Sequence, residues 1–426
     1  MSTTIRNIIL GVISGTWQDV TAPDAAFSWL PFTIQRAGGQ FRARPDWTID
    51  AARPTGTAYY VSTAGSDSND GLTAGAPLRR IATAYNKADV VEIRIAAGVY
   101  GVSSTQNMTK NISLIGSGTV IYGGFVDPGT LTFALDGTYT HTYKATRSNV
   151  GMVRDTLSAD ANGDTASLTL RTSAADVEAN PGSWYLDGSN VLWIRRADGA
   201  AVTDTNCRIY FSSVNRVVTF SGANTFYVEN VQFEGGNLTG AVLVDYTTGV
   251  PTFYGNGCSF KYCQGANGFS TYGAITYLQN CVAARNYDDG FNYHLDGAFL
   301  PYAVEINCTG RDNGSAADID NGSSIHDGGS IVRLMGDYAR NVGRNVHDVT
   351  SGTTSWNLGC YAHDSTSAVN DCNWAVGTGG ADTAKMWLDT CRSSGSATDI
   401  EIAATASAYI HQFAGGGVYS GTPIAY

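Results

Sequence analysis

The sequence predicts an all-β protein that folds as a right-handed, single-stranded parallel β-helix, and three observations predict it. One short phrase recurs along the second half of the chain, at separations of 23 to 31 residues. Between its recurrences, apolar and polar residues alternate with the period of two that is typical of strands, and turn residues separate the runs. The 50 glycines and the charged content of 15% suit a chain with many tight turns.

The recurring phrase marks one equivalent position on each coil. It appears in the printed sequence as NVQFEGG, GCSFKYCQG, NCVAARN, NCTGRDN, MGDYARN, GCYAHDS and TCRSSG. The equivalent residues are Val231, Cys258, Cys281, Cys308, Gly336, Cys360 and Cys391. Strands repeating at this spacing stack in parallel, each coil about 4.8 Å above the last. We therefore expect a ladder of buried, reduced and inert cysteines.

The stretch at residues 59–100 predicts how the stack begins. It runs from YYVSTAGSDSNDG through APLRRIATAYNKA to VVEIRIAAGVY. Its middle part predicts a short amphipathic helix, with Pro77 in the first turn and an apolar face made of Ile81, Ala84, Tyr85 and Ala88. An uncovered coil exposes its core and strand edges, so we expect this helix to cap the stack. The opening resembles that of pectate-lyase-like β-helix proteins, and the resemblance spans about residues 58–410.

Two segments depart from the repeat. The first 57 residues are rich in Trp and Phe and end in a proline-containing linker, which predicts a small attachment or oligomerisation module. The phrase PGSWYLDGSNVLWIRR predicts a β-hairpin with an Asp187-Gly188 turn, and it resembles an insertion that projects from the early coils of β-helix enzymes and spike proteins. The predicted division is residues 1–57, the β-helix at 58–410 with its insertion at 140–212, and an end segment at 411–426.

Charge and hydropathy exclude two classes of partner. The formal net charge is −11 and no basic stripe reverses the sign locally, so nucleic acid is not a predicted partner. No run approaches the roughly 20 apolar residues needed to span a bilayer, so membrane insertion is not predicted. The apolar stretch at residues 8–13 is too short for a signal-peptide core, which predicts a protein made in the cytoplasm.

Histidines gather in one part of the chain, since four of the six lie between residues 294 and 363. Aligning the strands FNYH, SSIH and RNVH places His294, His326 and His347 in one exposed column. The column beside it holds amides and a hydroxyl, and acidic residues stand close to the strands. The predicted carbohydrate-binding residues are Asn292, Ser324, Asn345, Asn373 and the nearby Arg344. The catalytic candidates are Asp289, His294, Asp296, His326, Asp327, His347 and Asp348.

We interpret this face as a ligand groove in which His and Asn bind sugar hydroxyls and Asp serves as acceptor or general base. The alternative is that polar stacks on the flank of a β-helix only satisfy one another and fix the register. Trp184 and Trp193 on the hairpin are further candidates for sugar contact, although a trimer interface would use them equally well.

The reaction, if there is one, stays open at this stage. Hydrolysis needs two carboxyls about 5–5.5 or 6.5–9.5 Å apart, a distance that the sequence does not give. Polygalacturonase-type hydrolases carry adjacent aspartates and a Gly-His-Gly motif; here Asp288-Asp289 is present, but His326-Asp327-Gly328-Gly329 replaces the second motif. A lyase would need a cation beside a uronate, and Arg333, Arg340 and Arg344 are near, but no lyase motif is present.

No cofactor is predicted. Zinc is disfavoured because side chains on adjacent coils run parallel and do not converge, and no CxxC pair is present. The loop at residues 67–71, Asp-Ser-Asn-Asp-Gly, resembles a calcium loop but lacks the distal bidentate Glu, which favours an Asx-rich turn. Calcium stays the alternative there.

The phrases DDGFNYH and NGSSIHDGG and the Gly-rich end AGGGVYSGTPIAY resemble phage and prophage β-helix proteins of the tail-spike or receptor-binding type. The resemblance implies a virion appendage, often a homotrimer, that recognises a bacterial surface polysaccharide and docks to other virion proteins through residues 1–57. Three functions stay open: receptor binding without catalysis, depolymerisation by a spike or by a free lyase or hydrolase, and a purely structural role. A solenoid fold alone does not choose among them.

Overall fold

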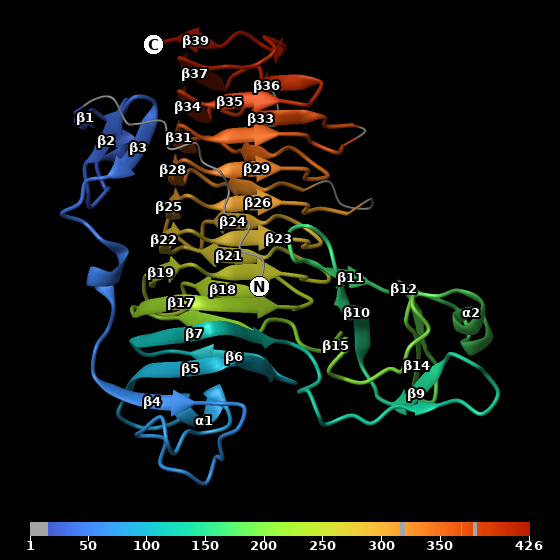
Figure 1. Cartoon of the computed structure of the whole chain (residues 1–426). Helices are drawn as coiled ribbons and strands as arrows, with labels where there is room; N and C mark the ends of the chain where they lie inside the picture. The colour runs from blue at the N-terminus through green and yellow to red at the C-terminus, as the bar shows by residue number, and fades with distance from the viewer. Residues whose placement is uncertain (1–15, 316–319, 368, 378–380) are drawn as a thin grey trace.

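The computed structural model describes residues 16–315, 320–367, 369–377 and 381–426. Short strands stack as successive coils from β4 at one end to β39 at the other (Figure 1). Like strands of neighbouring coils pair in parallel. The predicted right-handed parallel β-helix is therefore confirmed. No helix within the described ranges is long and apolar enough to cross a membrane.

Each coil contributes strands to three parallel faces. Face A consists of β6 (Gln106–Met108), β16 (Val218–Ser221), β18 (Val242–Asp245), β21 (Phe269–Tyr272), β24 (Phe291–His294), β27 (Ser323–Ile325), β30 (Val346–Asp348), β33 (Cys372–Val376), β36 (Thr398–Ile402) and β38 (Tyr419–Ser420). Face B consists of β4 (Thr57–Val61), β5 (Val90–Gly101), β7 (Ile112–Gly123), β17 (Thr225–Glu234), β19 (Thr252–Asn256), β22 (Ile275–Gln279), β25 (Tyr302–Ile306), β28 (Ser330–Leu334), β31 (Thr354–Leu358), β34 (Lys385–Asp389), β37 (Ser407–His411) and β39 (Ile424–Ala425). The long strands β5, β7 and β17 continue into face C, which adds β20 (Ser259–Lys261), β23 (Val282–Ala284), β26 (Thr309–Arg311), β29 (Asp337–Ala339), β32 (Tyr361–His363) and β35 (Arg392–Ser394).

The register of face C confirms the predicted ladder. Ser259 pairs with Val282, and Val282 pairs with Thr309, so the cysteines directly before them stand at the same level on successive coils. The same register continues to Arg392, so Gly336, Cys360 and Cys391 also stand at this level on their coils. All eight cysteines are free and buried, and burial raises the pKa of those in the ladder for which a shift is resolved, so these thiols stay protonated and unreactive.

Backbone geometry explains why the phrase repeats. The residue before each ladder position has a positive φ, in the left-handed region that most side chains avoid. Asn and Gly enter this region at low cost, and they occupy most of these positions, which are Asn230, Gly257, Asn280, Asn307, Met335, Gly359 and Thr390. The turn from face B to face C therefore favours Asn or Gly directly before the ladder position, because these residues fit its left-handed backbone.

Helix α1 (Ile81–Tyr85) lies beside β4 at one end of the stack (Figure 1). Three residues of the predicted apolar face, Ile81, Ala84 and Tyr85, are buried in the β-helix core. The position agrees with the expected place of a cap, and its capping role stays a prediction.

The N-terminal segment packs on the outside of face B. It contains β1 (Gln18–Val20), β2 (Ile34–Ala37) and β3 (Gln40–Ala43), with short 3-10 turns η1 (Ala25–Phe27) and η2 (Ile49–Ala52). Phe27 lies 5.6 Å from Trp356 and 5.7 Å from Trp387, measured between ring centroids. These tryptophans belong to an outward column of face B that pairs in register and is apolar along its length: Tyr254, Tyr277, Val304, Val332, Trp356, Trp387 and Tyr409.

This packing accounts for the aromatic content of the segment, because the column would otherwise expose a large apolar surface. A role of residues 1–57 in attachment or oligomerisation stays a prediction, and the first fifteen of them lie outside the described residues.

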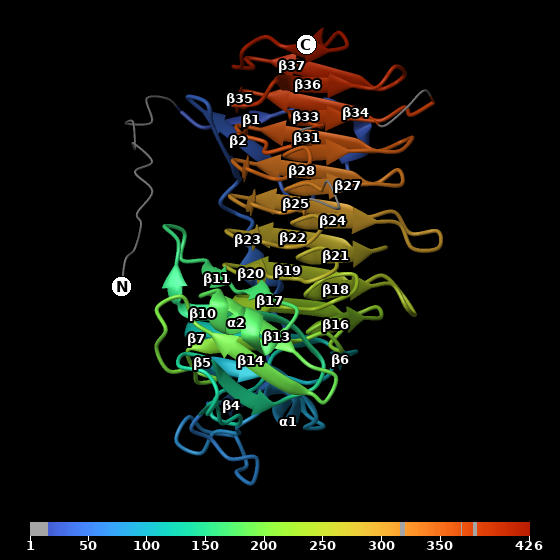
Figure 2. The same cartoon turned by 90° about the vertical axis from the view of Figure 1, so that its right-hand side faces the viewer.

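The insertion projects sideways from the lower coils as a separate small unit (Figure 1), and in Figure 2 it lies in front of these coils. Its elements are β8 (Ala134–Leu135), β9 (Tyr143–Thr146), β10 (Val150–Ala159), β11 (Thr165–Ser167), β12 (Thr169–Leu170), α2 (Ala174–Ala179), β13 (Ser183–Leu186), β14 (Val191–Arg195) and β15 (Cys207–Phe211). The predicted hairpin forms, with Ser183 opposite Arg195 and Leu186 opposite Leu192. A core of its own buries Val153, Trp184 and Ile209.

Candidate functional site

Six of the predicted site residues meet in one pocket of about 420 Å³ on the outer side of face A. We call it the histidine pocket. The six are Asp289, Asn292, His294, His326, Arg344 and His347. They come from three neighbouring coils, so residues that lie far apart in the chain become neighbours through the parallel register.

The strands β24, β27 and β30 place these side chains. Asn292 pairs with Ser324, and Ser324 pairs with His347, which puts these three in one outward column. His294 and His326 form the next column, with their rings stacked at 4.2 Å between centroids. The predicted level of His347 is wrong: it stands beside Ser324, two residues from the predicted alignment. Because a shift of two residues keeps the alternation of faces, His347 still faces outward.

Burial keeps two of the imidazoles neutral. It lowers the pKa of His326 to about 4 and that of His347 to about 3, and neighbouring cationic or histidine groups lower both further. Nε2 of His326 lies 2.8 Å from Oγ of Ser324, and Nε2 of His347 lies 3.4 Å from the carbonyl oxygen of Gly377. At neutral pH these rings are therefore hydrogen-bonding groups without charge.

One amide acceptor in the pocket has no partner. Asn292 is buried, and its Nδ2 donates to the carboxylate of Asp289. Its Oδ1 accepts no hydrogen bond from any described residue. A buried acceptor left without a donor costs free energy, so a donor that reaches this covered oxygen would be stabilised there.

A row of polar residues before the strands of face A forms one wall of the pocket. Each residue accepts the backbone N–H of the residue one coil further on: Asn267 from Asp289 at 3.0 Å, Asp289 from Asn321 at 2.6 Å, and Asn321 from Arg344 at 3.2 Å. Burial raises the pKa of Asp289, although hydrogen bonds from Asn292 and Asn321 oppose the shift. Sequence reasoning missed Asn267 and Asn321, yet the recurring pairs Asn267-Gly268, Asp289-Gly290 and Asn321-Gly322 were a usable signal.

Asn345 and Asn373 were predicted as sugar ligands, and this prediction is wrong. Both belong to a buried ladder of amides in which each Nδ2 donates to the next Oδ1, at distances of 2.7 to 3.0 Å: Asn286, Asn313, Asn341, Asn345 and Asn373. The alternative interpretation of the polar stacks holds for these residues, since their amides satisfy one another. Ser324 is also fully buried, and its hydroxyl donates to the carbonyl of His347, so it positions neighbours and cannot reach a ligand.

Asp348 was a catalytic candidate, and it lies in the core instead. Both of its carboxylate oxygens accept hydrogen bonds from Arg333 at 2.8 Å, and both residues are completely buried. Glu305 lies beside them and accepts hydrogen bonds from the hydroxyl groups of Tyr293, Ser323 and Tyr338. The physical reason is alternation, because the residue after an outward His347 must face inward.

The remaining candidate residues lie beside the histidine pocket, in its lining or in the insertion. Asp327 lies 3.0 Å from Nδ1 of His294 and orients that ring, while Asp327 and Asp296 do not line the pocket. Arg344 lines it and pairs with Glu401 at 2.8 and 2.9 Å. In the insertion, Trp184 is buried in the core, so its prediction as a sugar contact is wrong; Trp193 is half-buried beside Lys144, and its role stays a prediction.

The loop at residues 67–71 makes turn contacts of its own. Oδ1 of Asp67 accepts the backbone N–H groups of Arg79 and Arg80, and Oδ1 of Asp70 accepts that of Leu72. Within the described part of the chain, no group of three or more His, Cys, Asp or Glu residues is arranged to hold a metal ion. Calcium binding at this loop stays an untested alternative.

Solved structures show what the fold is similar to. A protein described as a glycoside hydrolase has a TM-score of 0.54 at 9% identity, over 85% of this chain and 96% of that chain. Pectate lyase Pel9A has a TM-score of 0.39 at 13% identity, over 84% of this chain and 80% of that one. The tailspike protein gp49 from Pseudomonas phage LKA1 has a TM-score of 0.28 at 12% identity, over 80% and 75% of the two chains.

The first likeness agrees with the β-helix described above, and at 9% identity it shows the fold alone. The other two, with TM-scores below 0.5, add no argument. No protein-family model matches the chain, and no curated protein matches it.

Proposed function

We propose that this protein binds a polysaccharide in the histidine pocket and that it does so as a surface appendage of a phage particle. The observation that carries the binding site is the pocket of about 420 Å³, in which neutral imidazoles surround the buried Asn292, whose Oδ1 receives no hydrogen bond from the described residues. Neutral donors and acceptors fixed by a rigid sheet suit sugar hydroxyls, because little ordering is needed when the ligand binds.

The virion part of the proposal is supported by the resemblance to tail-spike and receptor-binding proteins. That resemblance implies a homotrimer that docks to other virion proteins through residues 1–57. Light scattering should then give a mass about three times the 45.0 kDa of one chain. A monomeric mass would contradict the trimeric appendage and would leave the glycan site to be tested separately.

The binding site is tested with two variants, Asn292→Ala and His326→Ala, and purified host capsule or lipopolysaccharide. Loss of a hydrogen-bonding group in a desolvated site should weaken binding by about tenfold, measured by isothermal titration calorimetry. His363→Ala is the matched control, because His363 also stacks on a ring at 4.2 Å, that of Tyr361, but lies outside the pocket. Far-UV circular dichroism checks that each variant is folded.

Unchanged affinity in both pocket variants, with the fold intact, would overturn the proposal. So would an equal loss in His363→Ala, because the effect would then not belong to the pocket.

A second function, cleavage of the bound glycan, is favoured by the carboxyls that line the pocket, among which burial raises the pKa of Asp289. A carboxyl that holds its proton to higher pH is suited to act as a general acid, and Asp288 and Asp320 line the same pocket as further carboxyls. Sizing the polysaccharide after incubation tests this function. Shorter products that disappear with Asp289→Asn and persist with His363→Ala would support cleavage, and unchanged chain length with the unaltered protein would exclude it.

A further inference from the structure

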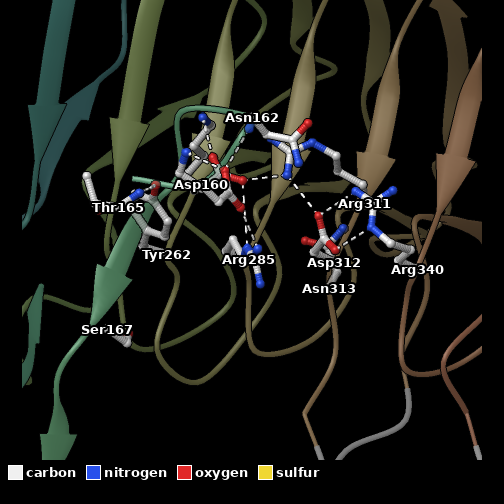
Figure 3. Close-up of polar contacts among 12 residues, drawn as sticks. Asp160, Asn162, Thr165, Ser167, Tyr262, Arg285, Arg311, Asp312, Asn313 and Arg340 are labelled. Atoms are coloured by element: carbon white, nitrogen blue, oxygen red, sulfur yellow. Dashed lines mark hydrogen bonds and ion pairs between the residues drawn. The ribbon is translucent and has the colours of Figure 1, made fainter. Parts of the chain in front are cut away.

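A second pocket, of about 550 Å³, lies between the insertion and the β-helix. We call it the arginine pocket. Strands β10 and β11 of the insertion supply one side, and the turns that follow β23 and β26 supply the other. Figure 3 shows the polar network around it, with Asp160 directed at Arg285 and Asp312 held between Arg311 and Arg340.

The carboxylates of this network are already neutralised. Asp160 pairs with Arg285 at 2.7 Å, and Asp312 pairs with Arg340 at 2.9 Å. Asp164 contacts both Lys261 and Arg311; burial alone would raise its pKa, but these two cations outweigh burial and hold the pKa at about 2. All three carboxylates are thus ionised and bound at neutral pH.

Of the charged residues that line the pocket, two are cationic, Arg154 and Arg285, and three are acidic, Asp160, Asp164 and Asp312. Three cations outside the lining, Lys261, Arg311 and Arg340, pair with Asp164 and Asp312. Each carboxylate of the lining therefore has a cationic partner.

Arg154 is the member without a counterion. It is only 6% exposed, lines the pocket, and pairs with no carboxylate in the described ranges. Its Nε donates to Oγ1 of Thr165 at 2.9 Å and its Nη1 to Oγ of Ser167 at 2.8 Å, while its guanidinium lies 3.7 Å from the ring centroid of Tyr262. A guanidinium has five N–H donors, so three remain for a ligand or water. A buried charge without a counterion is costly, and an anion entering the pocket would remove that cost.

We propose that the arginine pocket binds the anionic group of an acidic sugar, so that the glycan class of this protein is an acidic polysaccharide. This inference rests on the proposed glycan binding. The turn between β23 and β24 joins the two sites, since Arg285 and Asn286 line the arginine pocket and Asp288 and Asp289 line the histidine pocket. A single glycan chain lying over this turn places an acidic residue at Arg154 and a neutral residue at Asn292.

The test uses the full-length protein and three small probes at matched ionic strength: glucuronate, glucose 6-phosphate and glucose. Saturation-transfer NMR should detect one or both acidic sugars and show no comparable binding of glucose. Preference for glucuronate identifies a carboxylate-bearing sugar, and preference for the phosphate ester identifies a phosphorylated one. Arg154→Gln should weaken the affinity for the preferred acidic sugar by about tenfold or more, as expected for loss of a charge-assisted hydrogen bond.

Two further variants keep the test independent of folding. Arg147→Gln is the matched control, since Arg147 also lies over an aromatic ring in the insertion, 4.4 Å from the centroid of Phe211, and does not line the pocket. Ser158→Glu adds a negative charge at the exposed rim of the pocket and leaves Arg154 in place, so it should also weaken the affinity for the acidic sugar.

Binding of glucose as strong as that of both acidic sugars would overturn the inference, as would unchanged affinity in both Arg154→Gln and Ser158→Glu. Its failure is distinguishable from failure of the proposed function. If polysaccharide binding depends on Asn292 but no acidic sugar binds, the arginine-pocket inference is wrong and the proposed glycan binding stands. If acidic sugars bind at Arg154 but polysaccharide binding does not depend on Asn292 or His326, the proposed role of the histidine pocket is wrong and the arginine-pocket inference stands.

Discussion

At the scale of single residues, alternation along a strand decides which side chains line the histidine pocket. Asn292 and His294 stand two apart on β24 and both line the histidine pocket, as the sequence predicted. The same rule explains why Asp348 lies in the core beside Arg333, next to the outward His347. Asn345 and Asn373 were wrongly predicted as sugar ligands for a different reason, because hydrogen bonds between neighbouring amides hold their side chains in a buried ladder.

Asp348→Ala removes one partner of a fully buried ion pair and leaves Arg333 with Glu305, 4.0 Å from its Nε, as the neighbouring carboxylate. We expect the free energy of unfolding to fall by about 3–5 kcal/mol, measured by chemical denaturation. Asp327→Asn, which removes the charge of the half-exposed partner of His294 and still fits the left-handed backbone at φ of 61°, should cost about 1 kcal/mol or less. Equal losses in the two variants would contradict the different burial of the two carboxylates.

The pH dependence of stability reports on His326 and His347. Their folded pKa values of about 4 and 3 lie below the ordinary value of 6.5, so the unfolded chain takes up these protons first as the pH falls. Each histidine contributes stability that is complete above about pH 6.5 and is lost as the pH falls toward about 4 for His326 and about 3 for His347, with a slope of up to about 1.4 kcal/mol per pH unit. Denaturation of the double variant His326→Gln, His347→Gln should show a flatter slope in this range, and an identical slope would refute buried neutral imidazoles.

At the scale of elements, the turns were more informative than the strands. The small residue before each cysteine reflects a left-handed backbone, which is why a sequence phrase could reveal the coil register. The placement of the N-terminal segment was not predictable in the same way, since Phe27 meets Trp356 through a contact between segments far apart in the chain. The apolar outward column of face B was nevertheless a signal that another segment covers it.

Asn280 tests the role of these turns directly, with φ of 55°. Asn280→Val places a β-branched residue in the left-handed region and should lower the free energy of unfolding by about 1–2 kcal/mol or more. Asn280→Gly, which fits the same backbone, should change it by less than about 1 kcal/mol. Comparable losses by denaturation in both variants would show that the side chain of Asn280, and not its backbone, stabilises the turn.

At the scale of the whole molecule, stacking of coils brings distant residues into two adjoining pockets. The turn at residues 285–290 contributes residues to both, Arg285 and Asn286 to one and Asp288 and Asp289 to the other. The sequence predicted the histidine pocket from strand alignment. It did not predict the arginine pocket, because that pocket depends on how the insertion packs against Tyr262 and Lys261.

A crystal structure with a bound host oligosaccharide tests the central claim most directly. We expect a sugar hydroxyl to donate to Oδ1 of Asn292, with the sugar ring beside His294 and His326. An oligosaccharide bound clearly elsewhere, with the histidine pocket holding only water, would contradict the account.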